Sequence, residues 1–387
     1  MQTGKVLTLY QVLCKMKDNK AAQELRGKTA HGRRPRGAYG GLNVTKRKIG
    51  ILGAGTWGMA LARMLCVSGH DVLVWSAIEK EINNLSTTRV HPNLPGMKIP
   101  EELQFTKSIE EVCKDKDILL FAVPSVFVRS TAAKARPFVQ DGQVIVDVAK
   151  GIEPDTLYTM TEVLADELGK EGGPKNVHLV ALSGPTHAEE VAIDLPTTIV
   201  SASPDVEESK FVQEVFSNTC MRVYTNEDIK GVELSGAMKN VIALGVGIST
   251  GLGYGDNARA ALITRGIAEI ARLGVAMGCN VHTFAGLAGI GDLIVTATSM
   301  HSRNNRAGIL IGKGESPAQA VKEVGMVVEG INALPAAMEL AAKYNVEMPI
   351  VQTVNAIVKE GMSASDALRT LMDRNRKNEM PQGYEKV

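Results

Sequence analysis

Short apolar and β-branched runs alternate with amphipathic stretches between Lys48 and about Gly231. This alternation is typical of a parallel sheet flanked by helices. The first pair consists of a strand at Ile49–Leu52 and a helix at Thr56–Ser68. Further strands are predicted at Asp71–Trp75, Ile118–Val123, Val144–Val148, Val177–Leu182, Thr197–Ala202 and Met221–Tyr224.

After about Gly231 the strand-like runs almost vanish and helical periodicity takes over. A last short helix is expected to begin at Ser363, where cap-like residues precede an apolar pair. The longer helices are predicted at Leu234–Thr250, Ala258–Met277, Ser302–Ile311, Pro317–Val324, Gly330–Tyr344 and Pro349–Lys359.

The predicted fold class is therefore α/β, with an N-terminal Rossmann-type parallel sheet and a C-terminal all-helical domain. We divide the chain into a basic extension (residues 1–46), a Rossmann domain (47–231), a helical domain (232–380) and a tail (381–387).

The composition is that of an ordinary globular protein, with 44% hydrophobic and 22% charged residues in a chain of 387. The net charge of +1 conceals an asymmetry. Residues 1–47 hold eleven Lys and Arg and two acids, whereas the rest holds 32 basic and 40 acidic residues. Within this leader the segment GKTAHGRRPRGAYGG has no apolar periodicity, and the leader lacks the apolar core of a secretory signal. Three interpretations of the leader stay open: a disordered basic arm, an organelle-targeting peptide, or residues included because the start of the gene was assigned too far upstream. We favour an extension that takes no part in the chemistry.

Neither a membrane nor a nucleic acid is an expected partner. No stretch reaches the ~18 uncharged apolar residues of a membrane span; the nearest candidate is Val241–Gly253, which is shorter and rich in glycine. The basic leader could contact phosphate backbones, but it is separate from the folded body. We therefore expect no membrane span, no nucleic acid and a cytoplasmic protein.

Cysteine and histidine positions indicate neither disulfides nor a metal site. The five cysteines are scattered without a CxxC pair, which is typical of thiols in a reducing compartment. The histidines do not cluster at metal-ligand spacing, so we predict no metal.

A dinucleotide-binding motif occupies the turn between the first predicted strand and helix. Gly53, Gly55 and Gly58 form G-x-G-x-x-G with Thr56 and Trp57 between the last two glycines. In such a motif the first glycine permits the tight turn, the second admits the pyrophosphate, and the third allows close helix–strand packing. The helix N-terminus then offers N–H groups to the phosphates.

The choice between NAD and NADP stays open. An acid at the end of the second strand favours NAD, and a base there favours NADP. After Trp75 the chain supplies Ser76, Ala77 and Ile78, with Glu79 one turn late and Lys80 as a candidate phosphate partner.

Eight segments in order together resemble the bacterial type of NAD(P)-dependent glycerol-3-phosphate dehydrogenase, over Lys48 to Asn378. They are GAGTWGMALA, FAVPS, KGI, SGPTHAEEVA, GAMKN, GIGDL, HSRNNR and VVEG. The resemblance implies a Rossmann domain and a helical domain like that of 6-phosphogluconate dehydrogenase, and allows a homodimer. It implies reduction of dihydroxyacetone phosphate to sn-glycerol 3-phosphate with NADH or NADPH, which supplies glycerophospholipid synthesis.

Lys239 is the candidate catalytic residue. It stands immediately before an apolar, glycine-rich stretch that would desolvate its ammonium and lower its pKa, which suits a proton donor. The alternative is a lysine that extends to solvent. In the resembling family this lysine donates and accepts the proton and contacts the substrate.

Lys150 and the Ser302-Arg303-Asn304 segment are further candidates. Lys150 follows a predicted strand, at the sheet edge where α/β folds bind ligands. The family lysine that matches it contacts substrate and cofactor. The SRN segment opens a helix and suits a phosphate; by resemblance it binds the substrate phosphate, and Arg303 also reaches the cofactor.

Other roles are implied by the resemblance alone. Gly184, Thr186, Asp292 and, more weakly, Thr296 are assigned to the substrate; a carboxylate at Asp292 could also hold Lys239, or could merely cap a helix. His187 replaces an expected aromatic residue, either as a titrating group or as a stacking ring. The remaining assignments to the cofactor are Ala188, Val327 and Glu329.

Three other functions deserve comparison. A 6-phosphogluconate or β-hydroxyacid-type dehydrogenase would place an asparagine one helical turn after its lysine, but here Asn240 is adjacent to Lys239. A sugar-nucleotide dehydrogenase would need a catalytic cysteine, for which Cys279 is only a faint match. A non-catalytic nucleotide-binding or nucleic-acid-binding protein could use the basic leader, but the GKTAHGRRPRGAYGG segment of that leader has no interleaved aromatic residue beyond Tyr39.

Overall fold

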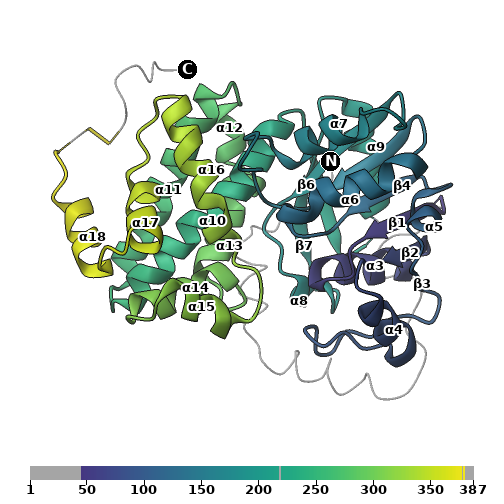
Figure 1. The fold of residues 1–387 in the computed structure, drawn as a ribbon, viewed down its shortest axis with the longest axis horizontal. Coiled ribbons are helices and arrows are strands. Elements are labelled where there is room, and N and C mark those ends of the chain that lie inside the picture. The colour runs from purple at the N-terminus through teal and green to yellow at the C-terminus, as the bar shows by residue number, and fades with distance from the viewer. Residues whose placement is uncertain (1–44, 218, 377, 380–387) are drawn as a thin grey trace, which may run out of the picture. The chain divides into compact units, whose positions relative to one another are not determined.

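The computed structural model describes residues 45–217, 219–376 and 378–379 (Figure 1). Most of the predicted extension, up to residue 44, and the whole predicted tail (381–387) lie outside the described residues. In the described chain an eight-stranded sheet is followed by a bundle of helices, which agrees with the predicted fold class.

The sheet has the strand order β3-β2-β1-β4-β5-β6-β7-β8, which is the Rossmann order in its first part. Most of its strands match predicted runs to within two residues, but the short β3 was not predicted. The strands are β1 (Lys48–Leu52), β2 (Asp71–Trp75), β3 (Gln104–Thr106), β4 (Ile118–Phe121), β5 (Gln143–Asp147), β6 (Val177–Ser183), β7 (Thr197–Ala202) and β8 (Met221–Asn226).

The sheet is parallel, as predicted, except at one pair of strands. β6 and β7 run antiparallel, with Leu182 opposite Ser201, whereas the other paired strands are parallel. A parallel return needs a crossover of a dozen or more residues, usually with a full helix. The connection between β6 and β7, residues 184–196, is long enough for this, but its only helix is the four-residue α8 (Ala188–Val191). The chain therefore re-enters the sheet at the edge from which it left.

Helices cover both faces of this sheet, which explains why β4 and β5 are buried at every position. One face packs against α3, α4 and α9, and the other packs against α5, α6 and α7. The helices of this part are α3 (Thr56–Val67), α4 (Glu79–Thr88), α5 (Ile109–Cys113), α6 (Val128–Ala135), α7 (Met160–Leu168) and α9 (Val206–Ser217).

The helical part is organised around α10 (Ile229–Gly251), whose residues from Gly231 to Ser249 are all buried. The predicted domain boundary at Gly231 falls in its first turn. Figure 1 shows α10 among the other helices of this part. These are α11 (Asp256–Ala276), α12 (Val281–Phe284), α13 (Asp292–Thr298), α14 (Arg303–Gly312), α15 (Pro317–Val324), α16 (Glu329–Lys343), α17 (Pro349–Lys359) and α18 (Ala364–Met372).

Glycines bring the backbones of α10 and α14 into close contact. A Cβ atom built on Gly308 would lie 2.2 Å from the carbonyl oxygen of Leu244, and one on Gly312 would lie 2.2 Å from that of Ile248. On the α10 side, a Cβ on Gly247 would meet the Asn305 carbonyl at 2.3 Å. Any side chain larger than hydrogen at these positions would push the two helices apart.

One described segment, Val281–Thr298, is long and apolar enough to cross a membrane by length and composition, with 44% of it buried. The sequence analysis named a different stretch, Val241–Gly253, as the nearest candidate and found none of sufficient length. The segment contains Asp292, which has no exposed surface and accepts hydrogen bonds from two lysines. A core segment of a folded protein meets the same criterion, and the buried, paired carboxylate favours that reading.

Candidate active site

Lys239 lies in the middle of α10 and is buried, with its side chain 7% exposed. The alternative of a lysine extending into solvent is therefore excluded. Its Nζ donates to Asp292 Oδ1 at 2.8 Å and to Thr296 Oγ1 at 2.5 Å. Burial lowers the pKa of Lys239 to about 8, Asp292 opposes that change, and the nearby Lys150 reinforces it. A lysine in this state can give up and regain a proton near neutral pH.

Asp292, at the start of α13, accepts hydrogen bonds from both lysines. Oδ2 accepts from Lys150 Nζ at 2.5 Å, and Oδ1 accepts from Lys239 and from Thr296 Oγ1. Burial by itself raises the pKa of Asp292, but Lys150 and Lys239 outweigh burial and hold that pKa below its usual value. The carboxylate is thus ionised, and the cluster of two lysines and one aspartate carries a net positive charge.

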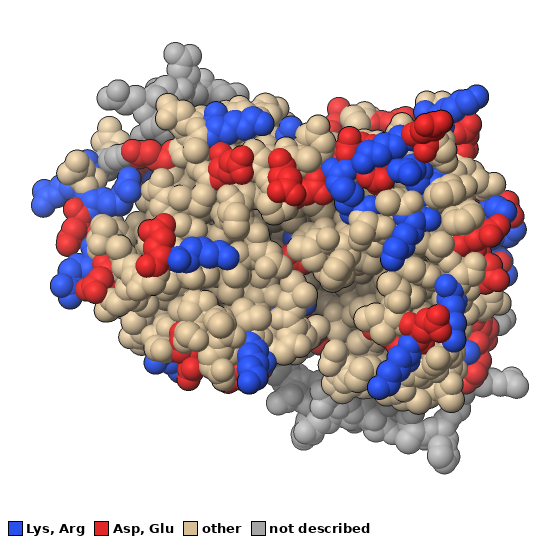
Figure 2. Space-filling model, viewed as in Figure 1, with Lys and Arg blue, Asp and Glu red and all other residues tan. Residues whose placement is uncertain are grey.

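Lys150 reaches this cluster from the sheet. It follows β5 at the carboxyl edge, and its Nζ also donates to the Gly184 carbonyl at 3.3 Å, just after β6. The stem of the Lys150 side chain passes α10 at Gly236, where a built Cβ would be 3.5 Å from Lys150 Cγ. Its side chain is 19% exposed, so Lys150 connects the buried pair with the surface. In Figure 2, charged side chains are visible within the hollow between the sheet part and the helical part.

The glycine turn between β1 and α3 has the geometry of a phosphate cradle. Gly53 adopts φ +123°, and a Cβ there would lie 2.5 Å from the Ala122 carbonyl oxygen. Gly58 is closed to a side chain by the Gly53 carbonyl at 2.2 Å. Gly55, by contrast, is exposed and has no neighbouring atom within 4 Å of a built Cβ, and no side chain caps the helix that follows. The open side of the turn therefore fits a dinucleotide pyrophosphate, with Thr56 and Trp57 half-buried beside it.

A contact between the two parts of the chain lies beside these groups. Ser125, in the FAVPS loop after β4, donates through Oγ to Glu329 Oε2 at 2.9 Å, at the start of α16. Burial raises the pKa of Glu329, and its bonds to Ser125 and the charge of Arg303 oppose that rise. Val327, two residues earlier, is half-buried. Glu329, Val327 and Arg303, all predicted cofactor contacts, thus belong to neighbouring helix N-termini.

The Ser302-Arg303-Asn304 segment opens α14, as predicted. Ser302 Oγ caps the helix by accepting from the Asn305 N–H at 3.2 Å. The Asn304 side chain donates to Asn240 Oδ1 at 2.9 Å and accepts from the Gly330 N–H at 2.8 Å, so it ties α14 to α10 and α16. These two partners use one donor and one acceptor position of the Asn304 amide. The contact of Asn304 with substrate stays a prediction.

The SGPTHAEEVA segment follows β6 and contributes loop groups together with the charge of Glu189, which acts on Arg303 and His187. Thr186 Oγ1 donates to the Gly184 carbonyl at 3.3 Å, and Ala188 begins α8. The His187 ring lies next to the His301 ring, with centroids 5.6 Å apart. Burial lowers the pKa of His187, and the charge of Lys239 adds to that effect.

Two buried acids near this site were missed by the sequence analysis. Glu233, on α10, accepts from the Thr161 N–H at 2.8 Å and from Thr161 Oγ1 at 2.5 Å, so it caps α7 from another element. Burial raises its pKa to about 7. Asp147, at the end of β5, is also buried, and its pKa is raised by burial and by Glu233. The sequence signal for Glu233 was its position between Val232 and Leu234 in an apolar helix.

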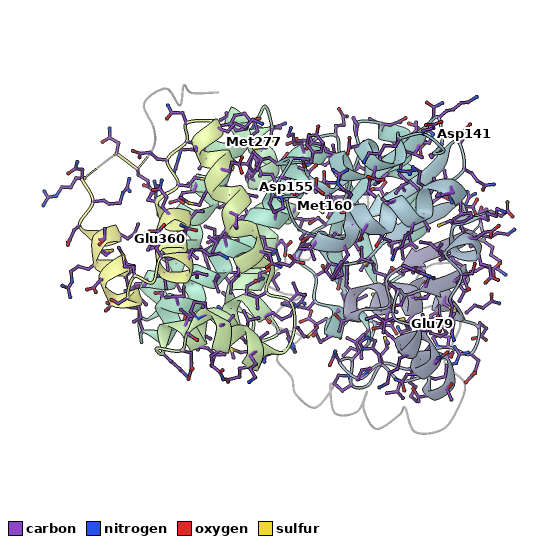
Figure 3. All side chains as sticks on the ribbon, in the orientation of Figure 1. Glu79, Asp141, Asp155, Met160, Met277 and Glu360 are labelled. Atoms are coloured by element: carbon purple, nitrogen blue, oxygen red, sulfur yellow. The ribbon has the colours of Figure 1, made fainter. Side chains whose placement is uncertain are left out.

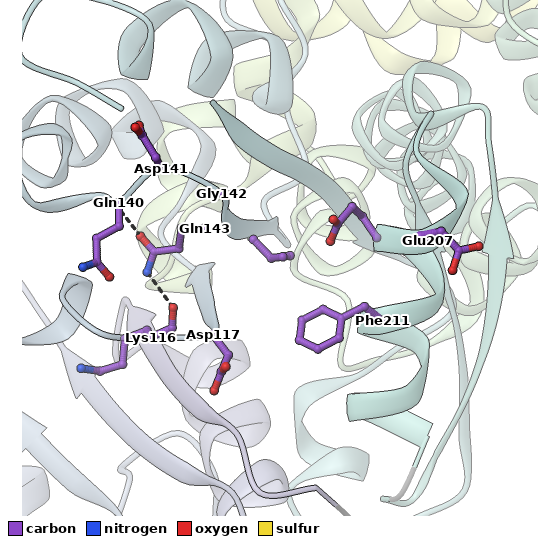
Figure 4. Close-up of a pocket in the computed structure, with 10 residues that line it drawn as sticks. Lys116, Asp117, Gln140, Asp141, Gly142, Gln143, Glu207 and Phe211 are labelled. Carbon is purple, nitrogen blue, oxygen red and sulfur yellow. Dashed lines mark hydrogen bonds between the residues drawn. The ribbon is translucent and has the colours of Figure 1, made fainter. Parts of the chain in front are cut away.

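The opposite, amino edge of the sheet holds a separate open depression (Figure 4). Its lining includes the acidic residues Asp117, Asp141, Glu207 and Glu208, whose negative charge disfavours phosphate binding. Gln143, also in the lining, donates a hydrogen bond to the Cys113 carbonyl at 2.9 Å. None of the predicted site residues lies there.

Next to that depression, His178, Asp205 and Glu208 each bring one ligand atom within 4.8 Å of the others. His178 Nδ1 lies 3.2 Å from Glu208, and Asp205 accepts from the Glu207 N–H at the start of α9. A histidine–carboxylate contact and a helix cap account for this grouping, which is the metal-like cluster found in the part of the chain that the structure describes.

Comparison with known proteins identifies the family. The family model described as the NAD-dependent glycerol-3-phosphate dehydrogenase N-terminus matches residues 48–209, and the model of the C-terminus matches residues 228–369. A glycerol-3-phosphate dehydrogenase (NAD(P)+) of Lactobacillus delbrueckii subsp. bulgaricus is 68% identical over 86% of this chain and 99% of its own length. One from Agathobacter rectalis is 51% identical over 86% of this chain and 97% of its own length.

Solved structures agree with this result. The crystal structure of glycerol-3-phosphate dehydrogenase from Coxiella burnetii has 36% sequence identity and a TM-score of 0.80, covering 85% of this chain and 99% of that one. The chain therefore belongs to the NAD-dependent glycerol-3-phosphate dehydrogenase family.

Proposed function

We propose that this enzyme interconverts dihydroxyacetone phosphate and sn-glycerol 3-phosphate, with Lys239 as proton donor and acceptor. The observation that carries the proposal is the buried cluster of Lys239, Asp292 and Lys150, which combines a titratable ammonium with a surplus positive charge. Ketone reduction requires a proton for the developing alkoxide, and an anionic substrate requires positive charge.

Each residue of the cluster has a separate task in this proposal. Lys239 protonates the carbonyl oxygen as the alkoxide forms, and the reverse reaction returns the proton to it. Asp292 orients Lys239, and Thr296 fixes the same ammonium from the next turn of α13. Lys150, which is partly exposed, contacts the substrate and helps to keep Lys239 easily deprotonated.

The substrate phosphate is assigned to the start of α14. Ser302, Arg303 and Asn304 present a helix N-terminus and a guanidinium, both of which favour an anion. Gly184 and Thr186 lie beside the lysine–aspartate cluster, because Lys150 and Thr186 both donate to the Gly184 carbonyl. We assign these five residues to substrate binding together with the cluster.

NADH or NADPH, when bound, supplies the hydride. Gly53, Gly55, Thr56, Trp57 and Gly58 would hold its pyrophosphate, since the turn is closed to side chains inside and open outside. Further contacts would come from Lys150, Ala188, Arg303, Val327 and Glu329.

A cytoplasmic location and a homodimer complete the proposal. Cys66, Cys113, Cys220 and Cys279 are free thiols among the described residues, and free thiols suit a reducing compartment. A homodimer is implied by the resemblance; sedimentation or light scattering at assay concentration would test it.

The activity itself is tested by following NADH and NADPH absorbance with dihydroxyacetone phosphate, and separately NAD⁺ and NADP⁺ reduction with 6-phosphogluconate. We expect turnover of the first substrate only. Turnover of 6-phosphogluconate in its place would overturn the proposal.

A further inference from the structure

We infer that Glu81 selects the coenzyme, accepting hydrogen bonds from the adenosine ribose hydroxyls and repelling the extra phosphate of NADP(H), so that the enzyme prefers NAD(H). The inference rests on the proposed function, because it concerns the coenzyme of that reaction. It assigns a role to a residue that the glycine motif and the second strand do not single out.

The end of β2 is the place where Rossmann domains distinguish the two coenzymes. Here β2 ends at Trp75, whose carbonyl accepts from the Gly53 N–H at 2.8 Å, so the strand end lies directly beside the glycine turn. The next residue, Ser76, is 7% exposed and carries no charge. An acid supplied from elsewhere could therefore occupy the usual position of the discriminating carboxylate.

Glu81 supplies that acid from the first turns of α4. Ser76 Oγ donates to Glu81 Oε2 at 2.6 Å and accepts from the Ile78 N–H at 3.2 Å. This hydrogen bond holds the carboxylate of Glu81, five residues further along the chain, at the end of β2. Glu81 is half-buried there. A carboxylate has about four acceptor sites, so a single bond to Ser76 leaves capacity for ribose hydroxyls.

Two hydrogen bonds connect Glu81 with the glycine turn through the end of β2. Ser76, which donates to Glu81, directly follows Trp75, and the Trp75 carbonyl accepts from the Gly53 N–H. The negative charge of Glu81 also raises the pKa of His91, against the larger lowering by burial. The carboxylate of Glu81 is therefore held at the strand end that adjoins the glycine motif.

Among the described residues near this edge, Lys107 and Arg89 already have partners and Lys80 is exposed. Lys107 Nζ lies 3.2 Å from Glu79, and Arg89 donates to the Leu103 carbonyl at 2.7 Å. Lys80, the candidate phosphate partner from the sequence, is exposed and adjacent to Glu81. A 2′-phosphate placed at the strand end would thus meet a carboxylate first, which disfavours NADP(H) by like-charge repulsion.

The test is titration of the full chain with NADH and NADPH, followed by fluorescence in the absence of any triose phosphate. We expect the wild type to bind NADH about tenfold or more tightly than NADPH, the scale of a charge-assisted hydrogen bond. Glu81→Gln should reduce that ratio about tenfold, and Ser76→Ala should shift it in the same direction to a smaller degree.

Glu79→Gln is the matched control. Glu79 lies on the same turn, carries the same charge and is 72% exposed, standing on the outside of α4 (Figure 3). Its substitution should change the NADH-to-NADPH ratio by less than about twofold, since exposed charges are screened by salt. Thermal unfolding of each variant checks that it is folded, and Ser76→Ala tests the same contact without a charge change.

Two results would overturn the inference: a wild type that binds NADPH as tightly as NADH, or equal effects of Glu81→Gln and Glu79→Gln. A loss of NADPH binding in Lys80→Ala, with Glu81→Gln silent, would instead assign the site to the phosphate. Selective NADH binding without reduction of dihydroxyacetone phosphate overturns the proposed function alone. Unselective binding with normal turnover overturns this inference alone.

Discussion

Lys239 Nζ and Asp292 Oδ1 lie 2.8 Å apart in the interior, and the other oxygen of the same carboxylate holds Lys150. One carboxylate therefore balances two ammonium groups, which leaves the cluster positive where it meets the surface at Lys150. A buried charge without a counter-ion is costly, so arrival of an anionic substrate stabilises this arrangement. The charge balance of the protein interior and the proposed chemistry thus depend on the same three side chains.

Lys239→Met should lower kcat for dihydroxyacetone phosphate about 10²–10⁴-fold, the usual contribution of a positioned general acid. Stopped-flow or steady-state NADH oxidation measures the effect. Lys230→Met is the control, since Lys230 lies on the same helix but forms a partly exposed ion pair with Glu162 at 3.0 Å. Near-normal turnover in Lys239→Met would rule out its role as proton donor.

The rate of ketone reduction should depend on pH through Lys239. Its pKa is lowered to about 8, and reduction needs the protonated form. The rate should therefore stay level below about pH 8 and fall above it, whereas oxidation of glycerol 3-phosphate should rise through the same range. Profiles of kcat against pH in both directions check this; profiles that bend the same way in both directions would contradict it.

Lys150→Met should move that pH profile to higher pH. Lys150 lowers the pKa of Lys239 by like-charge repulsion, so its removal lets the ammonium keep its proton longer. KM for dihydroxyacetone phosphate should increase at the same time, because the proposed substrate contact is lost. A change in KM with an unmoved profile would mean that Lys150 binds substrate without tuning Lys239.

Asp292→Asn should destabilise the fold as well as the reaction. It leaves two buried or partly buried ammonium groups without their carboxylate, and breaking a buried ion pair costs about 3–5 kcal/mol. Urea unfolding monitored by circular dichroism measures the loss. Asp155→Asn, at an exposed carboxylate (Figure 3), should change the free energy of unfolding by less than about 0.5 kcal/mol. Equal stability of the two variants would exclude a structural role for Asp292.

The sequence predicted most of the fold because burial and periodicity are local signals. The helices Pro317–Val324 and Pro349–Lys359 agree with α15 and α17 at both ends, where a proline marks each start. The strand β3 was missed because it has only three residues, and the antiparallel turn into β7 depends on how a short connection folds back. Neither feature leaves a periodic pattern in the chain.

Candidate site residues could be named where a charge borders an apolar run, as at Lys239, or where the family resemblance points to them, as at Asp292. Contacts between distant segments were not. Ser125 meets Glu329 across 204 residues, and Glu81 reaches Ser76 only because α4 begins where it does. Asn304 stays a predicted substrate contact, but its hydrogen bonds to Asn240 and Gly330 on neighbouring helices could not be predicted from the sequence. Such pairings follow from tertiary packing, which one sequence does not display.

Stability should depend on pH through Glu269, which caps α17 from α11. Its carboxylate accepts from the Ile350 N–H at 2.9 Å, and burial raises its pKa to about 7. The folded protein therefore holds this proton up to about pH 7, whereas the unfolded chain releases it near pH 4.5. The contribution is full below about pH 4.5 and is lost as pH rises to about 7, on the order of 3 kcal/mol in all.

Glu269→Gln should remove that part of the pH dependence. Unfolding free energies measured between pH 4.5 and 8 should decline less for the variant than for the wild type. Glu339→Gln, at an exposed position of α16, should keep the wild-type slope. Parallel slopes for the wild type and Glu269→Gln would contradict a proton held at this site.

The glycine contacts between α10 and α14 have a consequence for substrate size. α10 carries Lys239, and α14 begins with the residues assigned to the phosphate, so the separation of these helices fixes how far a reacting carbonyl can lie from its phosphate. Because Gly308 and Gly312 have no side chain, they set the close spacing of the two helices without touching the reacting groups. A redesign for longer phosphorylated ketones would begin there, by widening the helix pair, rather than among the charged groups that touch the ligand.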